Sequence, residues 1–182
     1  RSIARAKPGI YRVAVGGGES RFVASGDRAP HFSPRGDRIF IIEKDYAGES
    51  PAEILVSVTP DGYDRHEHLR TPDADTSELS PSPDHRWIAF RERQQYYVMP
   101  WHETGNRITV SALAGEVPAH RLTEGGGFAL AWSQDSSALT WSLGPQLFRA
   151  ALRPGAAPVV RPLADAGLVV PPTGYAAHRG PP

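Results

Sequence analysis

Two histidines stand two positions apart in His66-Glu67-His68, the first pattern in this chain that could do chemistry. Residues i and i+2 of a β-strand point to the same face, so two imidazoles at this spacing could chelate a metal ion. A metal site also needs a third or fourth ligand. The surrounding stretch, Asp64–Arg70, is polar apart from Leu69. We therefore interpret the pattern as a solvated outer strand and predict no metal site there.

Three acidic residues follow closely, at Asp73, Asp75 and Glu78. Carboxylate oxygens are the ligands that calcium prefers in proteins, so a calcium loop is the chemistry that this cluster would offer. Acidic loops of this length are more often simply solvated, and we interpret the cluster in that way.

Other catalytic signatures are absent from the sequence. The chain has no cysteine and no Gly-x-Ser-x-Gly motif, which excludes a thiol nucleophile, a Cys-ligated zinc site and a nucleophile elbow. Gly16–Gly18 and Gly125–Gly127 lack the Lys-Ser/Thr that completes a phosphate-binding loop, and we interpret them as turns. We predict no catalytic, cofactor-binding or metal-binding residue in this chain.

Trp101 and His102, with the loop 103–106, stand apart from the regular pattern. They fall between two strand-like segments, 96–98 and 108–113, where a repeat carries an insertion. Binding residues concentrate in long loops, so an exposed Trp101 would suit a partner or ligand. Packing of Trp101 on a hydrophobic edge is the alternative, and we favour it.

The charge balance excludes some partner classes. The 182 residues contain 20 Lys+Arg and 20 Asp+Glu, so no basic excess points to nucleic acid. No apolar run approaches the roughly 20 residues of a membrane span. We expect neither nucleic acid nor a membrane as a partner. The chain begins at Arg1 without an apolar signal segment, and we expect it to be part of a longer protein.

An internal repeat is visible around three serines, Ser33, Ser82 and Ser133. Each serine starts a tight-turn signature and is followed by a short apolar run, 38–42, 87–90 or 138–143. The serines are 49 and 51 residues apart (82 − 33 and 133 − 82), which is close to the length of a propeller blade. Helical periodicity is absent.

Further segments recur within each repeat and predict two more strands. The first set is 9–13, 53–58, 95–98 and 146–149, and the polar outer set is 19–24, 64–70, 119–123 and 159–163. Four short strands per repeat are typical of a propeller blade. The sequence therefore predicts an all-β fold, a partial β-propeller of about three and a half four-stranded antiparallel blades.

The predicted domain covers 1–165, with a half blade at about 8–28 and full blades at about 29–72, 77–124 and 127–164. The Pro-rich stretch 166–182 reads as an extended linker or tail. Closed propellers have about four to eight blades, so this arc would leave blade faces open. An open sandwich of the same strands is the alternative.

Aromatic residues recur at equivalent positions of the repeats, and we predict that they pack between blades rather than form a ligand cage. They are Phe32, Phe40, Trp87, Phe90, Tyr97, Trp132, Trp141 and Phe148.

The repeat resembles the Ser-Pro-Asp-Gly repeat of TolB-like propellers. The carrying segments are 32–39 (FSPRGDRI) and 82–90 (SPDHRWIAF), although Arg35 replaces the Asp and Ser136 follows Asp135 without a Gly. Segments 82–100, 121–127 and 141–148 (WSLGPQLF) are similar to the propeller half of bacterial proteins that join a TolB-like propeller to a metal-dependent amidohydrolase barrel.

This resemblance implies a non-catalytic propeller segment of a larger, amidohydrolase-like hydrolase, which packs on the catalytic domain and shapes substrate access. Any zinc or other divalent metal of the parent would then lie outside this chain. Related proteins imply an exported, periplasmic or secreted location. The alternatives are a TolB-like protein-interaction module without an enzyme, the propeller of a serine peptidase, and a homodimer that closes the propeller.

Overall fold

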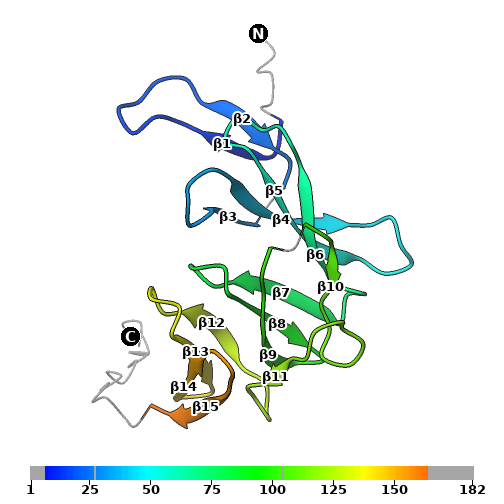
Figure 1. Cartoon of the computed structure of the whole chain (residues 1–182), viewed down its shortest axis with the longest axis vertical. Coiled ribbons are helices and arrows are strands. Elements are labelled where there is room, and N and C mark those ends of the chain that lie inside the picture. Colours follow the sequence, from blue (N-terminus) through cyan, green and yellow to red (C-terminus); the bar gives the residue numbers. More distant parts are fainter. Residues whose placement is uncertain (1–6, 27, 104, 164–182) are drawn as a thin grey trace, which may run out of the picture.

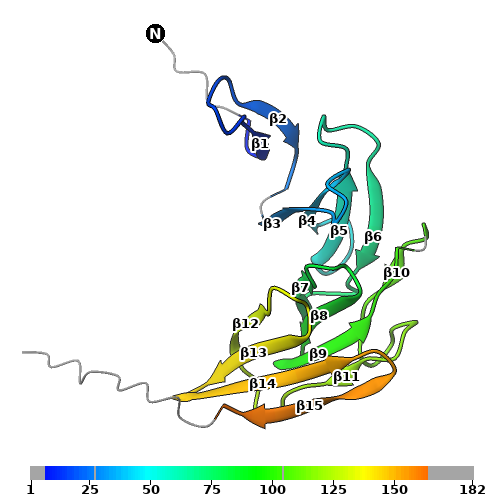
Figure 2. The ribbon, with the colours of Figure 1, turned by 60° about the vertical axis from the view of Figure 1, so that its left-hand side comes forward.

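The computed structural model describes residues 7–26, 28–103 and 105–163, and in these residues all regular structure is β-strand. The fifteen strands form four sheets, one after another along the chain. Figures 1 and 2 show the sheets following one another along a curved arc, with β1–β2 at one end and β12–β15 at the other. The described residues hold no helix that could cross a membrane. The all-β prediction is therefore confirmed.

Each sheet is built mainly from strands that are neighbours in sequence. The first sheet contains β1 (Ile10–Arg12) and β2 (Arg21–Ala24). The second contains β3 (Arg28–Phe32), β4 (Ile39–Asp45), β5 (Ala52–Val58), β6 (His66–Arg70) and β10 (Ile108–Thr109). The third contains β7 (Thr76–Pro81), β8 (Trp87–Glu92), β9 (Gln95–Pro100) and β11 (His120–Arg121). The fourth contains β12 (Phe128–Trp132), β13 (Ala138–Leu143), β14 (Gln146–Arg153) and β15 (Ala156–Pro162).

The repeated serines build the same turn in three sheets. In the third sheet, the Ser82 N–H donates to the Trp87 carbonyl at 2.9 Å, and the His85 N–H donates to the Ser82 carbonyl at 2.9 Å. The same two bonds form around Ser33 and Ser133. The residue three positions after each serine has a left-handed backbone: φ is 73° at Gly36, 57° at His85 and 60° at Ser136. Glycine adopts this conformation without strain, whereas the other two copies accept some strain.

Three hydrophobic clusters hold neighbouring sheets together. Val23 and Ile54 belong to a cluster between the first and second sheets, and Phe40 and Phe90 to one between the second and third. A third cluster, which includes Trp141, joins the third and fourth sheets. Strands β4 and β8 begin with four successive buried residues each, because sheets or loops cover both of their faces.

One strand lies outside the sheet in which its place in the sequence would put it. β10 follows β9 of the third sheet but pairs in parallel with β6 of the second, with Ile108 opposite Leu69. Arg107 donates to Glu67 on β6 at 2.8 Å, which supports this placement. The strand covers an edge that would otherwise expose unpaired backbone groups. The sequence predicted only an insertion here.

Most of the predicted strands are present, with shifted ends. The predicted outer segment 119–123 shrinks to β11, and the segment 146–149 extends to Arg153 in β14. The packing prediction is wrong for Phe32, whose side chain is 61% exposed, because it points away from the clusters at the edge of the second sheet. The predicted linker 166–182 lies outside the described residues.

Candidate functional site

His66 and His68 do not form a shared site. His66 is exposed and its Nε2 lies 2.8 Å from the Asp64 carboxylate, whereas His68 is buried and its Nε2 lies 2.7 Å from Ser57 Oγ. The register of β5 and β6 shifts beside His68, so the i, i+2 rule does not align the two rings. Burial lowers the pKa of His68 and favours its neutral form.

The carboxylates of Asp73 and Glu78, in the acidic cluster, already accept hydrogen bonds from other groups of the protein. Asp73 Oδ1 accepts the N–H groups of Asp75 and Thr76 at 2.9 and 3.3 Å. Glu78 accepts from Arg91 at 2.7 Å and from the Tyr96 hydroxyl at 3.1 Å. Among the described residues, no group of three or more His, Asp or Glu is arranged to hold a metal ion.

Trp101 belongs to the core and not to a binding loop. Its side chain is 2% exposed and packs in the cluster between the second and third sheets. Its ring centroid lies 5.3 Å from that of His85 and 6.1 Å from that of Phe40. Packing on a hydrophobic edge, the interpretation that we favoured, is therefore correct. The neighbouring His102 is exposed.

The fourth sheet has one covered face and one open face. Along β14, Ala150 and Leu152 are buried against the third sheet. The alternate residues Arg149, Ala151 and Arg153 are exposed and point the other way. No further described sheet packs on that side, because β12–β15 is the end of the arc (Figure 2). We call this side the outer face.

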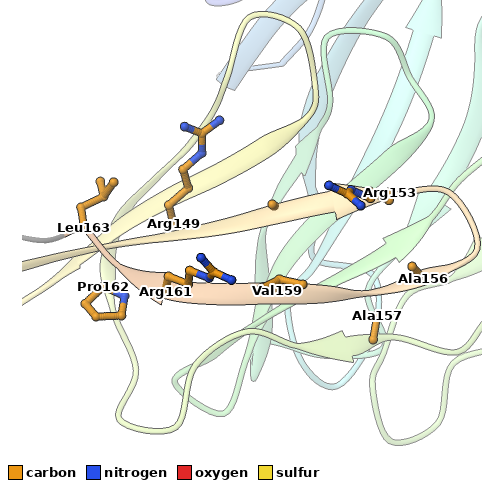
Figure 3. A pocket seen from close by; sticks show the side chains of 9 residues that line it. Arg149, Arg153, Ala156, Ala157, Val159, Arg161, Pro162 and Leu163 are labelled. Atoms are coloured by element: carbon orange, nitrogen blue, oxygen red, sulfur yellow. The ribbon is translucent and has the colours of Figure 1, made fainter.

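A shallow cavity of about 620 Å³ lies on the outer face. Figure 3 shows that its walls come from the two neighbouring strands β14 and β15, and that three arginine side chains belong to it. The lining residues are Arg149, Ala151, Arg153, Ala156, Ala157, Val159, Arg161, Pro162 and Leu163. Small and aliphatic side chains thus alternate with guanidinium groups on one surface.

Arg149 and Arg161 lie directly opposite each other across the strand pair. Both are exposed, and no carboxylate of the described residues forms an ion pair with either of them or with Arg153. Several arginines elsewhere are paired, for example Arg70 with Asp45, and Arg38 with Asp64 at 2.8 Å. Like charges directly opposite across a strand pair are destabilising. Because these three arginines form no ion pair with a described carboxylate, the outer face presents uncompensated positive charge.

This surface can bind anions, but it offers no group for catalysis. Guanidinium groups present planar forks of donors that suit carboxylates, and they keep their charge at all physiological pH values. The lining contains no His, Ser, Asp or Glu that could act as a nucleophile or as a general base. The arrangement fits the recognition of an acidic, partly apolar surface.

Our reading of the sequence did not identify these arginines. The signal was present, because Arg149, Ala151 and Arg153 alternate with Ala150 and Leu152 at the period of a half-buried strand. Their opposition to Arg161 depends on the register of β14 and β15, which the sequence does not state. No protein-family model matches this chain, and no curated protein sequence matches it.

Proposed function

We propose that this chain is a non-catalytic partial β-propeller that docks an acidic surface of another folded domain onto its outer face. The observation that carries the proposal is that Arg149 and Arg161 lie opposite each other on the outer face, and that neither forms an ion pair with a described carboxylate. A partner that places carboxylates there would remove the repulsion within the pair. The aliphatic side chains of Val159 and Leu163 would add apolar contact.

The order of the sheets supports the propeller part of the proposal. Strands β12 to β15 follow one another in the sheet in the same order as in the chain, and the serine turn recurs in three sheets. Neighbouring sheets pack face to face through hydrophobic clusters. Such repetition around an arc is how propeller blades are organised.

The proposed partner is the catalytic domain of the same parent protein. This part of the proposal rests on the resemblance of 82–100, 121–127 and 141–148 to the propeller half of propeller-plus-amidohydrolase proteins. In such an arrangement the propeller packs on a hydrolase domain and shapes substrate access, while the other domain supplies all catalytic groups.

Charge reversal tests the proposal. We would express the chain alone and together with the coding sequence that flanks it in its gene, and measure amide hydrogen exchange in β14 and β15. We expect the flanking domain to slow exchange there. The double variant Arg149→Glu/Arg161→Glu should abolish that protection, because it keeps a like-charge pair within the sheet but reverses the charge offered to the partner.

The matched control is Arg21→Glu, which changes an exposed arginine of β2 that also lies opposite another arginine, Arg12, but in the first sheet at the other end of the arc. It should leave the protection of β14 and β15 unchanged. Equal exchange in the isolated and extended chains would show that the outer face docks nothing in the parent. A dimer of the isolated chain in light scattering, abolished by the double variant, would instead assign the outer face to self-association.

A further inference from the structure

Two histidines from different sheets face each other between the second and third sheets. His31 lies in β3, and His85 lies in the turn between β7 and β8. Their Nε2 atoms are 3.1 Å apart, and their ring planes are inclined at 79°. His85 is buried, with 6% of its surface exposed.

The other nitrogen of each ring faces an acceptor. His31 Nδ1 lies 2.8 Å from the Ala29 carbonyl oxygen, and His85 Nδ1 lies 3.3 Å from a carboxylate oxygen of Glu103. A carbonyl and a carboxylate can only accept hydrogen bonds. Each Nδ1 must therefore carry its ring's hydrogen. If both rings are neutral, neither Nε2 atom carries a hydrogen, and the lone pairs of the two Nε2 atoms face each other.

For two neutral rings, the number of hydrogens makes this conflict unavoidable. Three contacts run in series, from Ala29 to His31, from His31 to His85, and from His85 to Glu103, and each needs one hydrogen. Two neutral imidazoles supply only two. Moving a hydrogen from Nδ1 to Nε2 repairs the central contact but breaks an outer one. A single positive charge between the two Nε2 atoms, either an added proton or a metal ion, satisfies all three contacts.

The geometry matches that of metal-binding histidines. Such histidines commonly donate the second ring N–H to a carboxylate or a backbone carbonyl, which are the partners of His85 and His31 here. Zinc–nitrogen bonds of ~2.0–2.1 Å in a tetrahedral site put two ligating nitrogens ~3.3 Å apart, close to the separation seen. A groove of about 390 Å³ runs beside His85 and Glu103, and its lining also includes Arg35, Asp84, Arg86 and His102.

We propose that His31 and His85 bind one divalent transition-metal ion between their Nε2 atoms, with water molecules as the third and fourth ligands. Imidazole nitrogen is a preferred ligand of zinc and copper. Because His31 and His85 come from neighbouring sheets, the ion would also clamp those sheets together. Glu103 is a positioning residue that orients the His85 ring.

Zinc chloride titrated into the chelator-stripped chain by calorimetry tests the proposal. We expect one zinc ion per chain and a rise in the thermal unfolding midpoint with zinc concentration. His31→Gln and His85→Asn should each weaken binding by at least about tenfold, and Glu103→Gln by roughly tenfold. Asn is chosen at position 85 because it tolerates the left-handed backbone there. Circular dichroism checks that each variant is folded.

His66→Gln is the matched control, because His66 is exposed and bonds Asp64 instead. It should bind zinc like the parent chain. The proposal is overturned if the chain shows no saturable zinc binding, or if His31→Gln binds as tightly as the parent. It is also overturned if nitrogen NMR finds a hydrogen shared between the two Nε2 atoms that zinc does not displace.

Discussion

The side chain of Glu53 accepts a hydrogen bond from the backbone N–H of Leu79 at 3.1 Å. Glu53 lies in β5 of the second sheet and Leu79 in β7 of the third, so one buried carboxylate joins two sheets. Arg28 and Lys44 donate to its other oxygen, the lysine at 3.2 Å. The carboxylate is therefore satisfied on both oxygens although only 1% of the residue is exposed.

Replacing Glu53 should destabilise the whole arc. Glu53→Ala leaves the Leu79 N–H without a partner in the core and leaves Arg28 and Lys44 without a counter-charge. We expect a loss of roughly 2–4 kcal/mol in the free energy of unfolding, measured by urea denaturation. Glu49→Ala is the control, because Glu49 is exposed, and it should change the free energy by less than about 0.5 kcal/mol. Equal losses for the two variants would contradict the role given to Glu53.

Glu53 should also contribute to acid unfolding. Burial raises the pKa of Glu53, but the Leu79 N–H, Arg28 and Lys44 outweigh burial, and its pKa lies below the ordinary value of 4.5. Because the folded-state pKa is the lower one, the stabilisation is fully present above about pH 4.5 and is lost as the pH falls through the folded-state pKa.

Urea midpoints measured from pH 7 to pH 3 check this dependence. Below about pH 4.5 the parent chain should lose stability more steeply than Glu53→Gln, whose side chain does not titrate. Other carboxylates titrate in both proteins, so the difference between the two curves isolates Glu53. Parallel curves would show that its pKa is the same in the folded and unfolded states.

Trp101 should be essential for packing between the second and third sheets. Trp101→Ala would empty the space beside Phe40 and His85, and we expect a loss of about 3–5 kcal/mol in the free energy of unfolding. Trp101→Phe should lose less, because an aromatic ring remains. The neighbouring variant His102→Ala, at an exposed position, should have little effect in the same denaturation experiment. A mild effect of Trp101→Ala would contradict the burial of this side chain.

Because Arg149 and Arg161 lie opposite each other, reversing the charge of one of them should stabilise the fold. Arg149→Glu would place opposite charges directly across β14 and β15, where the parent has like charges. We expect a gain of about 0.2–1 kcal/mol in the isolated chain, seen as a higher thermal midpoint that declines with added salt.

Arg153→Glu is the matched control for that reversal. Arg153 lies on the same strand and on the same outer face, but its register partner is Ala156. It should therefore gain much less stability. A larger gain from Arg153→Glu than from Arg149→Glu would contradict the cross-strand origin of the effect.

Several features followed from the sequence alone because they are local. The three serine turns depend on hydrogen bonds within five residues of the chain, and the apolar runs that follow them form β4, β8 and β13. Their order along the chain also predicted sheets of sequential strands, since consecutive strands joined by short turns pair with one another.

Other features depend on contacts between segments far apart in the sequence, so only the tertiary structure determines them. The position of β10 depends on the edge of β6, with which it pairs. The contact between His31 and His85 depends on how closely the second and third sheets pack. Strand register alone puts Arg149 opposite Arg161, because a shift of one residue would turn every side chain of β15 to the other face. A single sequence specifies residue types and local periodicity, whereas register and packing between sheets follow from the free energy of the whole fold.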